Sequence, residues 1–124
     1  MKRYEERLAR DLRAIRDRVS GMASRVATAI ENSVRALQHS DHNLGAETIL
    51  GDHLVNRTMR EIDRLCHAFI AVHLPSAGHL RTLSALMRVN LGLERIGDYA
   101  VTIARVRSEE HTSELQSQFR ISYA

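Results

Sequence analysis

The sequence contains no tryptophan, one cysteine and one proline, and aromatic residues make up only 4% of its 124 residues. The single cysteine, Cys66, excludes an intramolecular disulfide framework or a zinc-ribbon cluster and suits a reducing compartment. With six glycines and one proline, the composition argues against an all-β or collagen-like chain. No apolar run approaches the ~18 residues that span a bilayer, and no signal segment opens the chain. These absences predict a small, soluble, intracellular protein of one domain.

The net charge is only +3, although the chain is rich in arginine and Lys2 is its one lysine. Arginines and acidic residues alternate near the amino terminus, at Arg3, Arg7, Arg10, Arg13, Arg18 and Arg25 and at Glu5, Glu6, Asp11 and Asp17. This mixture is typical of a solvated, charge-paired helix face, whereas a nucleic-acid surface needs one-sided basic charge. We therefore expect no nucleic-acid partner.

Apolar residues recur every three or four positions in three long segments, which predicts three amphipathic helices over 5–38, 44–73 and 77–105. The first stripe is Leu8, Leu12, Ile15, Val19, Met22, Val26, Ile30, Val34 and Leu37. The second is Val55, Met59, Ile62, Cys66 and Phe69, widened by Leu54, Leu65 and Ile70; the third is Leu80, Leu83, Met87, Leu91, Val101 and Ala104. Polar residues over 38–43 and Pro75 separate the helices, with Ser76 as the expected N-cap of the third. The pattern predicts an all-α, up-down-up three-helix bundle of long antiparallel helices.

Residues 107–124 break this pattern because they carry no coherent apolar stripe. The string RSEEHTSELQS, over 107–117, resembles the in-frame translation of a common sequencing-adapter oligonucleotide. We therefore interpret residues 1–106 as the native domain and 107–124 as a non-native tail, the alternative being a genuine polar tail. On this interpretation the natural protein continues differently after Val106.

Two predicted helices each place oxygen ligands at i,i+4 on their apolar stripe: Asp52 and Asn56 on the second, Glu94 and Asp98 on the third. Asp52 lies seven residues before Met59, and Glu94 has the same spacing from apolar residues on both sides. Ionised carboxylates turned into a bundle are costly unless a positive group or a proton neutralises them. The sequence therefore predicts a compensating partner for these carboxylates.

The spacing does not show which group compensates the carboxylates. Paired oxygen ligands on facing helices can hold Mg, Mn or Fe, and Zn is also possible. Equally, the carboxylates can lie at the edge of the stripe, met by water or by Arg57, Arg88 or Arg95. A ferritin-like di-iron site would also need an inward Glu-x-x-His pair, which the three segments lack. Gly97 weakens the third helix, and we expect it to admit a close neighbouring helix or bound ions.

Three segments of the sequence carry recognisable motifs. They are the run Leu93-Glu-Arg-Ile-Gly-Asp-Tyr-Ala-Val101, followed by Ile103-Ala104, the set Gly51-Asp52…Asn56…Glu61-Ile-Asp63, and Pro75-x-Ala77-x-x-Leu80-Arg81. Together they resemble the PhoU family, the phosphate-signalling accessory proteins of bacteria: the first resembles the motif of that family's third helix, the second its second helix, and the last the start of its third. The order and spacing agree over residues 1–106.

The resemblance implies an all-helical fold of two tandem three-helix repeats, each with an acidic motif that can hold a metal cluster. This chain is similar to the amino-terminal repeat. The family's pattern then implies metal ligation by Asp52, Asn56, Glu94 and Asp98, with Fe, Mn, Mg or Zn. Two positions depart from the pattern: His79 replaces an aspartate, and Gly92 replaces a polar or acidic residue.

The same resemblance implies a non-enzymatic regulator that represses the phosphate-starvation response. Its partners would be a PhoR-type sensor histidine kinase and the phosphate-specific ABC transporter, at the cytoplasmic face of the inner membrane, with a homodimer in the full-length protein. The alternatives are a carboxylate-bridged metal-binding enzyme and a helical association module that binds no metal. A lone repeat is expected to self-associate through its uncovered apolar surface.

Overall fold

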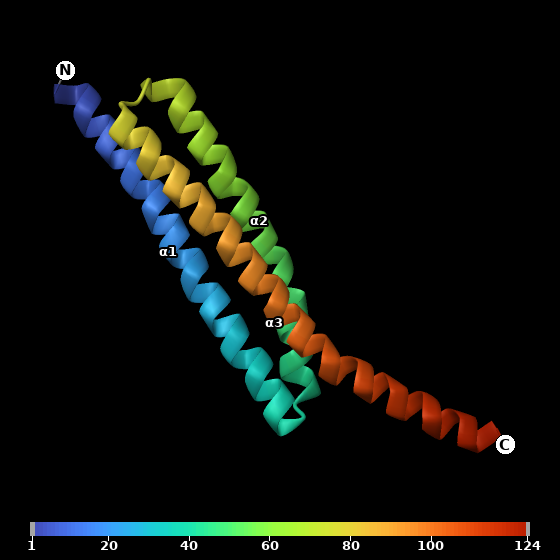
Figure 1. Ribbon diagram of the computed structural model, residues 1–124. Coiled ribbons are helices and arrows are strands. Elements are labelled where there is room, and N and C mark those ends of the chain that lie inside the picture. Colours follow the sequence, from blue (N-terminus) through green and yellow to red (C-terminus); the bar gives the residue numbers. More distant parts are fainter. Residues whose placement is uncertain (1, 124) are drawn as a thin grey trace.

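Three long helices account for the fold. The computed structural model describes the backbone of residues 2–123 and the side chains of residues 3–106. The helices are α1 (Lys2–His39), α2 (His42–His73) and α3 (Ala77–Tyr123), and each packs against the other two. They run antiparallel in an up-down-up bundle, with no strand in the described part of the chain (Figure 1). The predicted fold class is confirmed.

The carboxyl-terminal part of α3 differs from the expected boundary. We expected this helix to end near residue 105, but its backbone continues to Tyr123. In Figure 1 this last part leaves the other two helices and extends alone, away from the bundle. The predicted non-native tail lies largely in this extension, and the side chains of 107–124 lie outside the described residues.

The two connections are short because polar side chains cap the helices. Asp41 Oδ1 accepts a hydrogen bond of 3.0 Å from the Leu44 backbone N–H at the start of α2. Ser76 Oγ accepts one of 3.3 Å from the His79 N–H at the start of α3, as predicted. Leu74 ends α2 in the left-handed conformation, with φ 34°.

The core lies along the bundle axis and follows the predicted stripes over most of their length. Its buried members are Leu8, Leu12, Ile15, Val19, Met22 and Val26 of α1, Val55, Ile62, Cys66 and Phe69 of α2, and Leu83 of α3. On α3 the buried positions 83, 90, 97 and 104 are seven residues apart, the spacing of helices that pack side by side. This core holds the three helices together.

The predicted stripe is wrong at the end of α1. Ser33 and Ala36 are fully buried there, whereas Val34 and Leu37 are 38% and 36% exposed. The small side chains allow close packing: a methyl group on Gly45 of α2 would lie 3.8 Å from the Ala36 Cβ. Because the helices approach so closely, small residues occupy the interface and the larger ones turn outward.

Two predicted core residues of α3, Leu80 and Leu91, are 42% exposed. Leu80 and Leu91 lie about 60–80° around the helix from the buried position Leu83 and about 100–120° from Gly97, as a rotation of about 100° per residue requires. A second apolar stripe lies on the other flank of α3, where Val89, Ile96 and Tyr99 are 49%, 42% and 64% exposed. Helix α3 is therefore apolar over a wider arc than its two neighbours cover.

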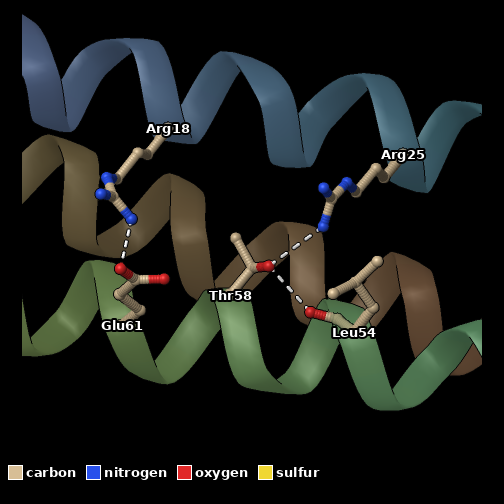
Figure 2. A network of polar contacts seen from close by, with 5 residues as sticks. All are labelled: Arg18, Arg25, Leu54, Thr58 and Glu61. Atoms are coloured by element: carbon tan, nitrogen blue, oxygen red, sulfur yellow. Dashed lines mark hydrogen bonds and ion pairs between the residues drawn. The ribbon is translucent and has the colours of Figure 1, made fainter.

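Polar contacts on the surface join α1 to α2 (Figure 2). Arg18 donates to Glu61, and Arg25 Nη1 donates to Thr58 Oγ1 at 3.3 Å. Among the described side chains of α1, from Arg3 onward, the predicted pairing is found between Arg10 and its neighbour Asp11, at 3.8 Å. Exposed pairs of this kind each contribute about 1 kcal/mol or less.

We predict that the chain self-associates through the exposed stripe of α3. Light scattering coupled to size exclusion should give a mass above that of one chain, because association removes Ile96 and Tyr99 from water. Ile96→Glu should shift the distribution toward the monomer, whereas the exposed-site control Arg64→Glu should not. A monodisperse wild-type monomer would contradict this expectation.

Candidate functional site

Helix α3 lies close to both of its neighbours at Gly97. A methyl group built on Gly97 would lie 3.3 Å from Val55 Cγ1 and 3.8 Å from Asp52 Oδ1, both on α2. It would also lie 3.9 Å from Val26 Cγ2 on α1. The expectation of a close neighbouring helix at Gly97 is thus confirmed. The absence of a side chain here is what allows α3 to lie so close to Val55 of α2.

Asp52 and Asn56 are both half-buried on α2, one turn apart. Asn56 Nδ2 donates a hydrogen bond of 3.2 Å to Asp52 Oδ2. This bond orients the carboxylate but adds no positive charge. Within residues 3–106, Asp52 forms no ion pair.

Asp52 lines a cavity of about 460 Å³ between α1 and α2. The cavity exists because small residues surround it, including Ser24, Ala29, Gly51 and Gly97. The rest of its wall is mixed, with apolar side chains from α2 and α3 and polar or charged residues that include Arg25 and Glu47. The carboxylate therefore faces a space large enough for water and a small ligand.

Glu94 and Asp98 lie progressively further from the bundle axis. Glu94 is half-buried, but Asp98 is exposed, so the inward placement predicted for Asp98 is wrong. The physical reason is that four residues turn a helix through about 400°, so Asp98 is rotated ~40° further outward than Glu94. Only Asp52, Asn56 and Glu94 therefore lie at the edge of the buried seam.

No compensating cation contacts these carboxylates among residues 3–106. Arg57, Arg88 and Arg95 are exposed and pair with none of them. Over the same residues, no three His, Cys, Asp or Glu side chains lie close enough together to hold one metal ion. The seam therefore offers half-buried, unpaired carboxylates that are partly open to solvent, and it does not form a closed metal cage.

A buried amide on the same seam, Asn90, was not predicted from the sequence. Its side chain is 2% exposed, and Nδ2 donates a 3.0 Å hydrogen bond to the Met59 carbonyl of α2. Its Oδ1 has no partner among the described residues. The available signal was its position, seven residues from both Leu83 and Gly97 on the buried face of α3.

A group of contacts around His73, at the end of the bundle that holds the α2–α3 connection, was also not predicted from the sequence. His73 is 1% exposed, and its Nε2 lies 2.6 Å from Asp11 Oδ2. Tyr4 donates its hydroxyl hydrogen to the His73 carbonyl, and the Phe69 ring centroid lies 4.7 Å from that of His73. His73 continues the α2 stripe seven residues after Cys66, a spacing that could have predicted its burial. These contacts tie the first turns of α1 to the end of α2.

Cys66 is fully buried in the core, as expected from its place on the α2 stripe. Burial raises the pKa of the Cys66 thiol, and the negative charge of Asp63 raises it further. The thiol is therefore held in its protonated, unreactive form.

This architecture defines the chain as a long three-helix repeat with an acidic seam. The family model for the PhoU domain matches residues 19–106. The chain is 34% identical over 98 residues to the phosphate-specific transport system accessory protein PhoU homolog of Aquifex aeolicus, covering 79% of this chain and 44% of that protein. It is 33% identical over 106 residues to the phosphate-specific transport system accessory protein PhoU of Serratia marcescens, covering 86% of this chain and 44% of that protein.

A solved structure agrees with these sequence matches. The crystal structure of PhoU from Pseudomonas aeruginosa superposes with a TM-score of 0.78 at 29% identity, over 80% of this chain and 47% of that one. The chain therefore belongs to the PhoU domain family, as the resemblance of its motifs implied. It spans less than half the length of the curated relatives that it matches.

Two glycine substitutions test the close approach at Gly97. Gly92→Ala should stabilise the fold by ~1 kcal/mol, because alanine favours the helix and nothing lies within 4 Å of an added methyl group. Gly97→Leu should destabilise it by about 1–3 kcal/mol, because the side chain would collide with Val55. Urea unfolding followed by circular dichroism measures both. A Gly97→Leu variant as stable as wild type would contradict the packing described here.

Proposed function

We propose that this chain is part of a non-enzymatic regulator of phosphate uptake and signalling. In this proposal it represses the phosphate-starvation response by contacting a PhoR-type sensor histidine kinase and the phosphate-specific ABC transporter. It acts in the cytoplasm, at the inner face of the membrane, and the full-length protein is a homodimer.

The observation that carries this proposal is the agreement of fold and motif. The run from Leu93 to Val101 lies on α3, where Gly97 makes its close contact with α2. The relatives are named as accessory proteins of the phosphate-specific transport system, which supports a transport-linked role rather than an enzymatic one. None of the helices, over the described residues, is apolar over a long enough stretch to cross a membrane.

We further propose that the seam carboxylates take up a divalent or iron metal ion when one is available. Asp52 and Glu94 would supply the ligating oxygens, with the Asn56 amide and Asp98 at the margin of the site. Hard oxygen donors suit Mg, Mn and Fe, and water would complete the coordination shell. Bound metal would neutralise carboxylates that no arginine of residues 3–106 compensates.

Deletion of the complete gene tests the regulatory role. In cells grown with abundant phosphate, alkaline phosphatase activity should rise severalfold after deletion, and a plasmid copy of the gene should restore repression. The matched control is the same plasmid with a frameshift early in the gene. If alkaline phosphatase stays repressed in the deletion strain, the proposed regulatory role is wrong.

Elemental analysis and thermal unfolding test the metal site. The purified protein should retain Mg, Mn, Fe or Zn, and adding the metal should raise the unfolding midpoint by several degrees through mass action. Asp52→Ala should remove this shift, whereas Asp17→Ala, which alters an exposed carboxylate away from the seam, should keep it. Absence of both retained metal and a thermal shift would count against the site and favour an association module.

A further inference from the structure

A groove with an apolar floor and two arginines along one side lies at the end of the bundle that holds the α2–α3 connection. Its volume is about 740 Å³, and residues of the first four turns of α1 line it together with Leu74, Ser76 and His79. Leu8 and Leu12 form part of its floor and are each only 7% exposed. Tyr4, at 45% exposed, and Leu74 add apolar surface at its edges.

Leu74 is the most unusual residue of this groove. It ends α2 with φ 34° and ψ 62°, a left-handed conformation that glycine adopts readily and leucine does not. Its side chain is nevertheless 89% exposed, so the chain gains no burial from having leucine there. Leu74 therefore places a large apolar side chain in water beside the groove, where it is available for contact with a ligand.

The charges of the groove are not balanced within the chain. Arg13 and Arg16 line it and form no ion pair within residues 3–106, in contrast to Arg10 and Arg18, which are paired. Glu5 is the one acidic residue among those that line the groove. The groove therefore combines unpaired positive charge with an apolar floor.

We propose that this groove binds an acidic, amphipathic peptide segment of a partner protein. A large apolar side chain of the peptide would contact Leu74 and the floor, and flanking Asp or Glu side chains would pair with Arg13 and Arg16. Guanidinium groups suit carboxylates because they can form two parallel hydrogen bonds. The concave shape favours a peptide over a lipid surface, which needs a protruding rather than a hollowed face.

This site is separate from the acidic seam and does not depend on the role in phosphate signalling. The groove is formed by the beginning of α1, residues 74 and 76 and His79, whereas Asp52, Glu94 and Gly97 lie further along the bundle. Peptide binding to the purified chain can therefore be absent while the regulatory role is correct. Equally, the peptide can bind while the regulatory role is wrong.

Selection from a library of random 12-residue peptides displayed on phage tests the proposal. The selected peptides should be enriched in Asp and Glu beside Leu, Phe or Met. The consensus peptide, labelled with a fluorophore, should then bind the purified chain with a saturable increase in fluorescence polarisation. Failure to enrich acidic peptides, or enrichment of basic ones, would overturn the proposal.

Variants of the groove residues test whether the consensus peptide binds in the groove. The double variant Arg13→Glu/Arg16→Glu should weaken binding of the consensus peptide at least tenfold, whereas Arg57→Glu/Arg64→Glu, with the same change in net charge on α2, should leave it unchanged. Leu74→Gly should weaken binding severalfold yet leave the unfolding midpoint equal or higher, since glycine relieves the left-handed strain. Equal loss in both double variants would overturn the proposal. So would binding of phosphatidylglycerol vesicles, but not of the peptide, through the groove arginines.

Discussion

The close contact of three helices at Gly97 is the constraint on which the candidate site depends. Because this residue has no side chain, Val55 of α2 and Val26 of α1 both lie within van der Waals distance of where a methyl group would be. The Asp52 carboxylate borders the same point and faces a cavity bounded by small residues. A larger residue at Gly97 would separate α3 from α2 and displace the carboxylate. Gly97 therefore serves the packing of the three helices.

Most of the fold could be predicted from the sequence, because the apolar residues of α1 from Leu8 to Val26 repeat with unbroken regularity. The prediction failed where side-chain size overrode hydrophobicity: Ser33 and Ala36 are buried in place of the larger Val34 and Leu37. Periodicity gives the direction of a side chain to within tens of degrees and says nothing about the distance between helices. Only the packed structure shows that this end of the bundle is close-packed.

The candidate site was predictable in part. Asp52, Asn56 and Glu94 lie at the edge of the seam, whereas Asp98 is exposed, which was not predicted because the sequence does not show how wide an arc of α3 the neighbouring helices cover. The sequence analysis did not identify the contact of His73 with Asp11, because the two residues are 62 positions apart in the chain. The exposure of Leu74 was equally hidden, since it follows from the backbone conformation at the end of α2. Long-range pairing and turn geometry are the two things that a periodic pattern does not encode.

The most direct measurement of the central contact is the proton–proton nuclear Overhauser effect at Gly97. After resonance assignment, the Gly97 α protons should show strong cross-peaks to the methyl groups of both Val55 and Val26, because these groups surround the glycine. Gly92, near which nothing lies within 4 Å of an added methyl group, should show no such cross-peaks to α1 or α2. Assigned spectra in which Gly97 lacks cross-peaks to either valine would contradict the account.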